Sequence, residues 1–330
     1  MKIIFDLRST GLGNNGGSLT LIKSGNTLVD LGHEVYFVDT FRNMNTWTPL
    51  NAKHIIVKNK NQLPDADVII ATGYKSVALT VQAPKRCGLK IHWLRGWETW
   101  QMPDERIIER VLKAPTLKLV NGIGLQEKLN KYGFKSQLIR PGYDLHELYP
   151  TGKREQNNNN IIIGGLYHQK HSGIKRVSWL LDVWSYLKSK RKGVKLHLMG
   201  ATKPPSLTID KYITNPTIKD KNYFYNEIDI WMAPAMQEGL HMPPAEAMLT
   251  ECPIVTTTNP MSGTQDYALH EYNGLVSDDN YLSFQNSVEA LVKDKKARKT
   301  MGKRARESIV ELGSRQENML KLLQLIKDNI

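Results

Sequence analysis

The chain has 330 residues, 40% of them hydrophobic, and a formal net charge of +13 at pH 7. This length suits two domains of about 150 residues, each able to bury a core. No apolar run approaches the ~18 residues that cross a bilayer, and the charge at Asp6 comes too early for a signal peptide. The charge is divided evenly, with +7 in 1–150 and +6 in 151–330. It suits an anionic partner, which can be a nucleotide diphosphate, a phospholipid surface or a nucleic acid.

In the first 150 residues, strand and helix patterns alternate. Short β-rich runs predict strands at 2–7, 34–39, 54–57, 68–71, 90–94 and 118–121. Apolar residues at helical spacing predict helices at 18–31, 104–113 and 125–132. Alternation of this kind is typical of a parallel sheet covered by helices.

The segment 149–160 contains Pro150, Gly152, charged residues and a run of Asn, which is typical of a linker. After it the pattern restarts, with strands expected at 161–163, 195–199, 228–232 and 254–258 and helices at 178–190, 243–249, 282–292 and 315–330. The last helix has Leu320, Leu323 and Ile326 on one face. The sequence therefore predicts an α/β fold of two Rossmann-like domains facing each other across a cleft. The expected parts are a domain at 1–150, a linker at 151–160, a second domain at 161–312, and a C-terminal helix at 313–330 that packs back toward the first domain.

A glycine-rich loop follows the first strand, with Gly11, Gly13 and Gly16 in G-x-G-x-x-G spacing and Asp39 at the end of the next strand. This pattern is typical of a dinucleotide-binding turn and favours an NAD- or FAD-dependent oxidoreductase as an alternative. Three residues intervene between Leu7 and Gly11, so the turn is longer than in that fingerprint. The helix is also expected to start after Gly17, without a further glycine for close helix–strand packing. A glycine-rich loop at a helix N-terminus suits a phosphate or a sugar equally well.

Two carboxylates, Glu238 and Glu246, lie eight positions apart around Pro243 and Pro244. Two consecutive prolines are typical of a helix start, so Glu238 is expected on a loop and Glu246 in the first turn of the helix. Carboxylates on a loop and on the next helix can grip different hydroxyl groups of one extended ligand. The backbone N–H groups of Gly239 and Leu240 are candidates to meet an anion or a sugar oxygen. A pair of solvated acids around a helix cap is the alternative.

With these residues, the region 225–305 resembles the carboxyl-terminal half of GT-B glycosyltransferases of the family 4 type. Their signature is E-x7-E, which Glu238 and Glu246 match. The resemblance extends to the turn at 173–177 (GIKRV), the segment 140–144 (RPGYD), and Gly16-Gly17 followed by the 32–35 turn (GHEV). The family usually has Arg where Leu166 follows Gly165, and Gly where Glu251 precedes Cys252, so the chain departs from the pattern there.

The resemblance implies a retaining, metal-independent glycosyltransferase that uses a nucleotide-sugar donor. Glu246 would hold the donor ribose, and Glu238 would contact the transferred sugar. Lys175, together with Arg176, would neutralise the departing diphosphate, a role that fixed cations must fill when no metal does. Further donor-side candidates are Gly239, Leu240, Gly165, Gly17 and Gly16. Candidate acceptor-side residues are Arg8, Arg95 and Glu98, whereas His92, within a strand, is expected in the core.

His168 and His171 lie in a loop without a nearby carboxylate, so neither a metal nor another cofactor is expected. The expected acceptor is a saccharide or a lipid-linked glycan. DNA with hydroxymethylated bases is the alternative acceptor, and contact with a membrane surface stays open. Cys87 and Cys252 match no metal or redox spacing, which indicates reduced thiols in a cytoplasmic protein.

Overall fold

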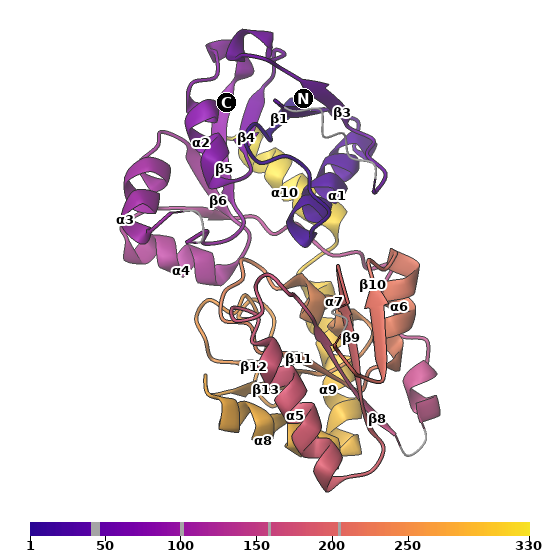
Figure 1. Ribbon diagram of the computed structural model, residues 1–330. Helices are drawn as coiled ribbons and strands as arrows, with labels where there is room; N and C mark the ends of the chain where they lie inside the picture. Colours follow the sequence, from indigo (N-terminus) through magenta and orange to yellow (C-terminus); the bar gives the residue numbers. More distant parts are fainter. Residues whose placement is uncertain (41–46, 100–101, 158–159, 204–205) are drawn as a thin grey trace. The chain divides into compact units, whose positions relative to one another are not determined.

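The computed structural model describes residues 1–40, 47–99, 102–157, 160–203 and 206–330. These residues form two compact units, one comprising Met1–Gly142 with Arg315–Ile330 and the other Tyr143–Ser314. In each unit a parallel sheet is covered by helices on both faces (Figure 1), so the predicted α/β fold is confirmed. No helix in the described part of the chain is long and apolar enough to cross a membrane.

The sheet of the first unit has the strand order β3-β2-β1-β4-β5-β6-β7 in the described residues. Its strands are β1 (Lys2–Asp6), β2 (Glu34–Asp39), β3 (Lys53–Ile56), β4 (Val68–Ala71), β5 (Leu89–Leu94), β6 (Leu117–Val120) and β7 (Gln137–Leu138). Its helices are α1 (Gly16–Asp30), α2 (Tyr74–Val81), α3 (Asp104–Ile107), α4 (Ile123–Lys131) and α10 (Arg315–Lys327), with short turns η1 (Lys60–Gln62), η2 (Lys85–Cys87) and the π-helical η3 (Ile108–Leu112).

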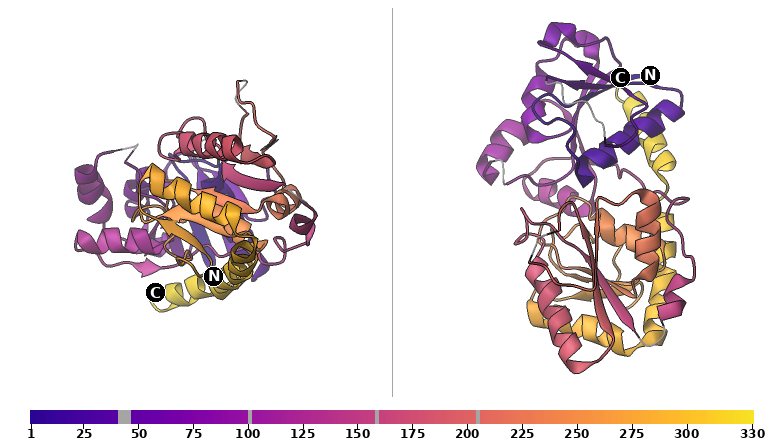
Figure 2. Two further views of the ribbon diagram at one scale, coloured as in Figure 1. Left: turned by 90° about the horizontal axis from the view of Figure 1, so that it is seen from below. Right: turned by 45° about the vertical axis from the view of Figure 1, so that its right-hand side comes forward.

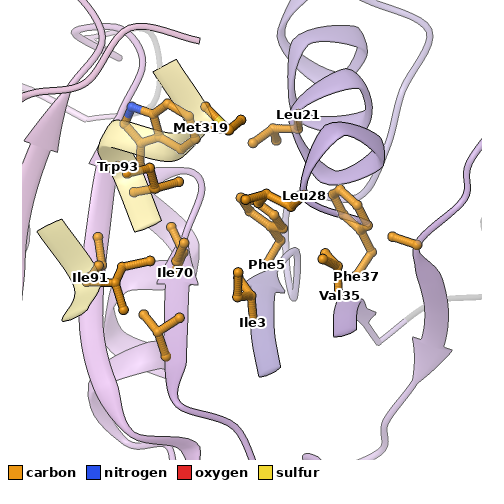
Figure 3. Close-up of a cluster of buried hydrophobic side chains, with 14 of the residues drawn as sticks. Ile3, Phe5, Leu21, Leu28, Val35, Phe37, Ile70, Ile91, Trp93 and Met319 are labelled. Atoms are coloured by element: carbon orange, nitrogen blue, oxygen red, sulfur yellow. The ribbon is translucent and has the colours of Figure 1, made fainter. Parts of the chain in front are cut away.

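Helices α1 and α10 pack side by side on one face of this sheet (Figure 2). Figure 3 shows Met319 of α10 beside Trp93 of β5 and Leu21 of α1, within one buried apolar cluster. The C-terminal helix therefore completes the core of the first unit. Its buried apolar residues are Met319, Leu322, Leu323 and Ile326, whereas Leu320 is 48% exposed and does not belong to the face expected for it.

The sheet of the second unit has the described strand order β10-β9-β8-β11-β12-β13. Its strands are β8 (Ile161–Leu166), β9 (Val194–Gly200), β10 (Lys211–Thr214), β11 (Ile230–Ala233), β12 (Ile254–Thr257) and β13 (Gly274–Ser277). Helices α5 (Val177–Lys190) and α8 (Tyr281–Lys293) share an apolar cluster on one face. Helices α6 (Ile218–Glu227), α7 (Met242–Leu249) and α9 (Lys295–Glu311) share a cluster on the other.

The segment expected as a linker is part of the second unit in the structure, and the first unit ends at Gly142 rather than at 150. It contains a 3₁₀ turn, η4 (Lys153–Asn157), and residues 158–159 of it lie outside the described part. The Arg154 guanidinium donates to the carbonyl oxygens of Tyr225 (3.1 Å), Thr250 (3.1 Å) and Glu251 (3.0 Å). These carbonyls lie at the C-terminal ends of α6 and α7, so one arginine caps both helices.

Each sheet has a point where the strand order reverses direction, and this point determines where a ligand can bind. In the second unit the chain proceeds from β8 to β9 and β10 on one side and resumes with β11 on the other. In the first unit the same reversal separates β1 from β4. Ligands of open parallel sheets bind beyond the carboxyl ends of the strands at this reversal.

Candidate active site

The reversal point of the second unit brings together the two loops that carry the predicted motifs. Lys175 and Arg176 end the loop after β8, and Glu238 lies on the loop after β11. The Met236 N–H donates to the Ile174 carbonyl at 2.8 Å and ties the two loops together. β8 and β11 are hydrogen-bonded neighbours, so residues 63 positions apart in the chain meet at one edge of the sheet.

Lys175 and Glu238 form an ion pair there, with side chains 16% and 17% exposed. The His241 ring Nε2 lies 3.4 Å from the same carboxylate oxygen. Burial raises the pKa of Glu238, but Lys175 and His241 outweigh it and hold that pKa below its usual value. Burial lowers the pKa of His241 to about 4, against the opposing effect of Glu238. At neutral pH the group therefore consists of a carboxylate, an ammonium and a neutral imidazole.

The loop after β12 holds this carboxylate in place. Gly263 has φ +71°, and a Cβ there would lie 2.7 Å from the Glu238 Cβ and 2.9 Å from the His241 nitrogen. The Glu238 N–H donates to the Met261 carbonyl at 2.7 Å, and the His241 N–H to the Gly263 carbonyl at 3.1 Å. Only glycine fits both this close approach and this backbone conformation without strain. The position of Glu238 is thus set by backbone contacts with a third loop.

Glu246 lies in α7, which begins at the two prolines as predicted, and is 7% exposed. It lies beyond the first turn, in which it was expected, because the helix already begins at Met242. Lys221 Nζ lies 3.1 and 3.0 Å from its two carboxylate oxygens, and the Tyr225 hydroxyl donates to Oε2 at 2.7 Å. Glu246 is therefore not a solvated helix-cap acid. Burial raises the pKa of Tyr267 well above its usual value, and both Glu238 and Glu246 add to this rise. The Tyr267 hydroxyl also donates to the carbonyl oxygen of His241, the N-cap residue of α7.

Arg176 is engaged with protein partners on three sides. It forms an ion pair with Asp279, which follows β13, and its guanidinium lies 4.2 Å from the centre of the Trp179 ring. It also donates to the Pro234 carbonyl at 3.4 Å. Its backbone is left-handed, with φ 48° and ψ 47°, at the N-cap of α5. These contacts fix Arg176 at the edge of the sheet and leave Lys175 as the cation next to Glu238.

The remaining donor-side candidates of this unit occupy different environments. Gly239 and Leu240 are buried, and neither backbone N–H has a hydrogen-bond partner among the described residues. Buried N–H groups are rarely left unpaired, so both can donate to a ligand oxygen. Gly165 instead lies within β8, where a Cβ would be 2.8 Å from the Leu180 side chain. Gly165 permits the close packing of α5 on the sheet.

The His168–His171 pair lies in the same region, contrary to the expectation that no carboxylate is nearby. The rings are 4.8 Å apart, and the charge of Glu238 acts on the pKa of His168, which burial, His171 and Lys175 lower. The described residues nevertheless contain no cluster of three or more His, Cys, Asp or Glu side chains arranged to bind a metal ion.

In the first unit, Arg8 is only 4% exposed and serves a buried ion pair. Its guanidinium donates to both oxygens of Asp6, at 2.8 and 2.7 Å, and to the Leu79 carbonyl at 3.0 Å. The Thr80 hydroxyl also donates to Asp6, at 2.7 Å. A buried carboxylate needs such partners, so these contacts stabilise the fold at the end of β1.

The other first-unit candidates gather at its reversal point. Gly16 and Gly17 are exposed in the first turn of α1, and Arg95 donates to the Gly17 carbonyl at 2.8 Å. Glu98 Oε1 is 3.7 Å from where a Cβ on Gly73 would lie, in the loop after β4. Loops that follow β1, β4 and β5 therefore bring Arg95, Glu98 and the glycine-rich loop together.

The expectation that α1 contains no glycine for close packing was wrong. The helix begins at Gly16, and Gly25 lies inside it, where a Cβ would be 2.5 Å from the Phe37 ring. The loop between β1 and α1, residues 7–15, is long, as expected. Asp39 is buried, and its Oδ1 accepts from the Thr40 N–H at 2.6 Å. A Cβ on Gly11 would lie 3.6 Å from Oδ2 of Asp39.

Sequence reasoning missed His241, Lys221, Tyr225 and Asp279. His241 lies inside the motif, three residues after Glu238, and that position could have drawn attention to it. The other three come from segments far from the motif in the chain, and only the packing of α6 and the order of the strands brings them to it.

Residues 158–294 match the model of the family described as Glycosyl transferases group 1. The capsular polysaccharide biosynthesis glycosyltransferase CapM of Staphylococcus aureus is 24% identical over 168 residues, which cover 46% of this chain and 42% of CapM. The alignment thus spans less than half of that relative.

Solved structures extend the similarity to the whole fold. HepE of Anabaena, determined in complex with UDP-glucose, superposes with a TM-score of 0.79 at 14% identity, covering 99% of this chain and 100% of HepE. Sucrose-phosphate synthase from Thermosynechococcus elongatus gives a TM-score of 0.76 at 16% identity, covering 99% and 98%. The chain therefore has the GT-B fold that the sequence predicted, and residues 158–294 of its second unit are similar to group 1 glycosyltransferases.

Proposed function

We propose that the protein transfers a sugar, with retention of anomeric configuration, from a nucleotide-sugar donor to a hydroxyl group of a saccharide or lipid-linked glycan. One observation carries this proposal. Lys175 and Glu238, predicted to act on the diphosphate and the sugar of one donor, are paired at the reversal point of a group 1 glycosyltransferase domain. A single bound donor can touch both groups there.

The donor would lie along the loops after β8 and β11. The Lys175 ammonium has three N–H groups, so it can contact phosphate oxygens while it stays close to Glu238. The buried N–H groups of Gly239 and Leu240 would add hydrogen bonds, and Glu246 would accept from the ribose hydroxyls. The complex of HepE with UDP-glucose supports a nucleotide-sugar as the ligand class.

In the proposed step, the acceptor hydroxyl oxygen bonds to the anomeric carbon while the bond from that carbon to the diphosphate oxygen breaks. The departing phosphate oxygen takes the proton of the acceptor hydroxyl, so a glycoside and a nucleoside diphosphate form without a protein nucleophile. Negative charge grows on the diphosphate as the bond breaks, and the fixed charge of Lys175 stabilises it there. Glu238 would orient the sugar and stabilise positive charge that develops at the reacting carbon.

Metal independence belongs to the proposal, because Lys175 and backbone N–H groups supply the charge stabilisation that a divalent ion would otherwise give. Full activity in the presence of EDTA is the result that supports it. Loss of activity in EDTA that added Mg²⁺ or Mn²⁺ restores would contradict it.

A saccharide acceptor is supported by CapM, which by its name acts in capsular polysaccharide biosynthesis. The net charge of +13 suits DNA or a membrane surface in general terms, yet no group of described residues favours either. The oxidoreductase alternative loses support from the family match. A cytoplasmic location stays a prediction.

The donor class is tested by thermal unfolding of the protein with UDP-, GDP-, ADP- and dTDP-sugars. A ligand at 100 times its dissociation constant stabilises the folded protein by about 2.7 kcal/mol. A rise in Tm with at least one nucleotide-sugar is expected. No shift with any of them, at millimolar concentrations, would contradict the proposal.

The roles of Lys175 and Glu246 are separated by kinetics. Lys175→Ala should lower kcat about 100-fold or more at saturating donor, because charge stabilisation of the leaving group is lost. Glu246→Ala should mainly weaken donor binding, visible as a raised KM and Kd. Lys211→Ala removes a different lysine–glutamate pair of this unit, with Glu227 at 2.6 Å, and should leave turnover unchanged. Normal turnover of Lys175→Ala would exclude its assigned role.

A further inference from the structure

Glu246 is held by two side chains of α6 that the family resemblance did not assign. Lys221 Nζ approaches both carboxylate oxygens, at 3.1 and 3.0 Å, and the Tyr225 hydroxyl donates to Oε2 at 2.7 Å. Tyr225 is fully buried, whereas the side chain of Lys221 is 17% exposed. Solvent, and therefore a ligand, can reach the lysine but not the tyrosine.

The helix presents these two residues together because they are one turn apart. α6 begins at a capping box, in which Thr217 and Asp220 satisfy each other's backbone N–H groups. Its C-terminal carbonyls at Tyr225 and Ile228 accept from Arg154. Burial, reinforced by Glu246, raises the pKa of Tyr225 well above its usual value, so the phenol keeps its proton and remains a donor. Both ends of α6 are fixed, and Lys221 and Tyr225 hold one geometry.

The hydrogen-bond capacity of the group leaves specific positions open. A carboxylate has about four acceptor positions, and an ammonium has three donor hydrogens. Lys221 uses one position on each oxygen of Glu246, and Tyr225 uses a second on Oε2. One acceptor position on Oε1 and one N–H of Lys221 therefore remain, next to each other. An adjacent acceptor and donor match two neighbouring hydroxyl groups, of which one donates and the other accepts.

We infer that Lys221 recognises the donor together with Glu246, and that the two side chains bind the vicinal 2′,3′-diol of a ribonucleoside diphosphate. Tyr225 is a positioning residue that holds the Glu246 carboxylate in a fixed orientation. The inference rests on the proposed function, since it needs a nucleotide donor. The inference goes beyond the proposed function in two ways. It makes Lys221 a specificity-determining residue, and it predicts tighter binding of ribonucleotides than of 2′-deoxyribonucleotides such as dTDP.

The test is a set of double-mutant cycles between protein and ligand. Calorimetry gives Kd for the nucleoside diphosphate selected among UDP, GDP and ADP, and for its 2′-deoxy and 3′-deoxy forms, with wild type and Lys221→Met. If Lys221 binds one hydroxyl, removing both that hydroxyl and the lysine lowers the affinity no more than removing either one alone. Wild type should bind that deoxy form about tenfold more weakly than the ribonucleotide. Lys221→Met should bind it less than threefold more weakly than the ribonucleotide.

Two further variants keep the test decisive. Lys221→Arg retains the positive charge beside the buried carboxylate but changes the donor geometry. It should therefore fold and still lose the discrimination between the ribonucleotide and its deoxy form. It serves as the test if Lys221→Met does not fold. Lys211→Met removes a lysine–glutamate pair at the other end of α6 and should keep the wild-type ratios. Discrimination in both Lys221 variants equal to that of wild type, for both deoxy forms, would overturn the inference. Tighter binding of dTDP than of every ribonucleotide would also overturn it.

Failure of the proposed function gives a different result. If wild type binds none of the nucleotides, the donor assignment itself fails. If wild type binds a ribonucleotide and Lys221 shows no coupling to either hydroxyl, only the role of Lys221 fails.

Discussion

Lys175 and Glu238 neutralise each other in the free protein, although they are proposed to act on different parts of the donor. Their pairing explains how both charges remain in a largely buried place, since an isolated buried charge is costly. A diphosphate bound as proposed would share the Lys175 ammonium with Glu238, since an ammonium has three N–H groups. At the residue scale, both groups would then meet the proposed ligand already in position.

Burial of His92 gives the stability of the protein a measurable dependence on pH. His92 is fully buried in β5, and neither ring nitrogen has a hydrogen-bond partner among the described residues. Burial, with a smaller contribution from Lys118, lowers its pKa to about 3. This agrees with the expectation of a core position. The ring therefore stays neutral in the folded state at pH values where the unfolded chain binds a proton.

The sign of the pH effect follows from this difference. Below about pH 6.5 the unfolded state takes up the proton and the folded state does not, so the free energy of unfolding falls as pH decreases and is fully retained above that value. Between pH 7 and 5 the loss due to His92 is about 2 kcal/mol. His92→Phe should remove this part of the pH dependence. Urea unfolding of both proteins at pH 7 and 5 measures it, and equal pH dependence would contradict the assignment.

At the scale of elements, the end of α7 shows what a departure from the family pattern means. The Cys252 N–H donates to the Ala247 carbonyl at 3.2 Å and the Glu251 N–H to the Met248 carbonyl at 2.9 Å, which is the Schellman arrangement. Glu251 occupies the left-handed position of this turn, with φ 63°. Glycine is usual there because a side chain strains the backbone.

Glu251→Gly should therefore raise the free energy of unfolding by about 1 kcal/mol, through relief of the left-handed strain. Glu251→Ala is the matched control, because it removes the same carboxylate but keeps a Cβ, and it should give no gain. Thermal or urea unfolding compares the three proteins. Equal stability of the two variants would show that the backbone conformation is not the cause.

Helix α6 was not anticipated from the sequence, and the strand expected at 228–232 begins later, at Ile230. Ile228 instead ends α6 as its C-cap, and its carbonyl accepts from Arg154. The linker prediction for 151–160 rested on its polar composition. That composition could not reveal Arg154 as the common cap of two helices, because its acceptors lie 71 to 97 residues away in the chain.

At the scale of the whole molecule, the chain returns to its first unit at Arg315. The buried face of α10 lies in the same apolar cluster as Phe5, Leu21 and Trp93 (Figure 3). A unit whose core includes residues from both ends of the chain depends on the C-terminal helix for its stability.

Leu322→Ala should destabilise the first unit by about 3 kcal/mol, since Leu322 is fully buried in this core. Leu320→Ala, at a position 48% exposed on the same helix, should change stability by less than about 0.5 kcal/mol. Hydrogen exchange of amides in β1 and β4 reports the stability of this unit specifically. Equal protection in the two variants would contradict the packing of α10.

The sequence by itself determined the alternation of strands and helices, the start of α7 at its two prolines, and the resemblance of the second unit to group 1 glycosyltransferases. Periodicity, helix-start residues and short motifs are local, so one segment of chain carries each of them. Only the tertiary structure decided that Lys175 pairs with Glu238, that Lys221 and Tyr225 hold Glu246, that Arg8 is buried against Asp6, and that Leu320 faces outward. Partners of buried charged groups depend on strand order and helix packing, which residues distant in the chain fix jointly.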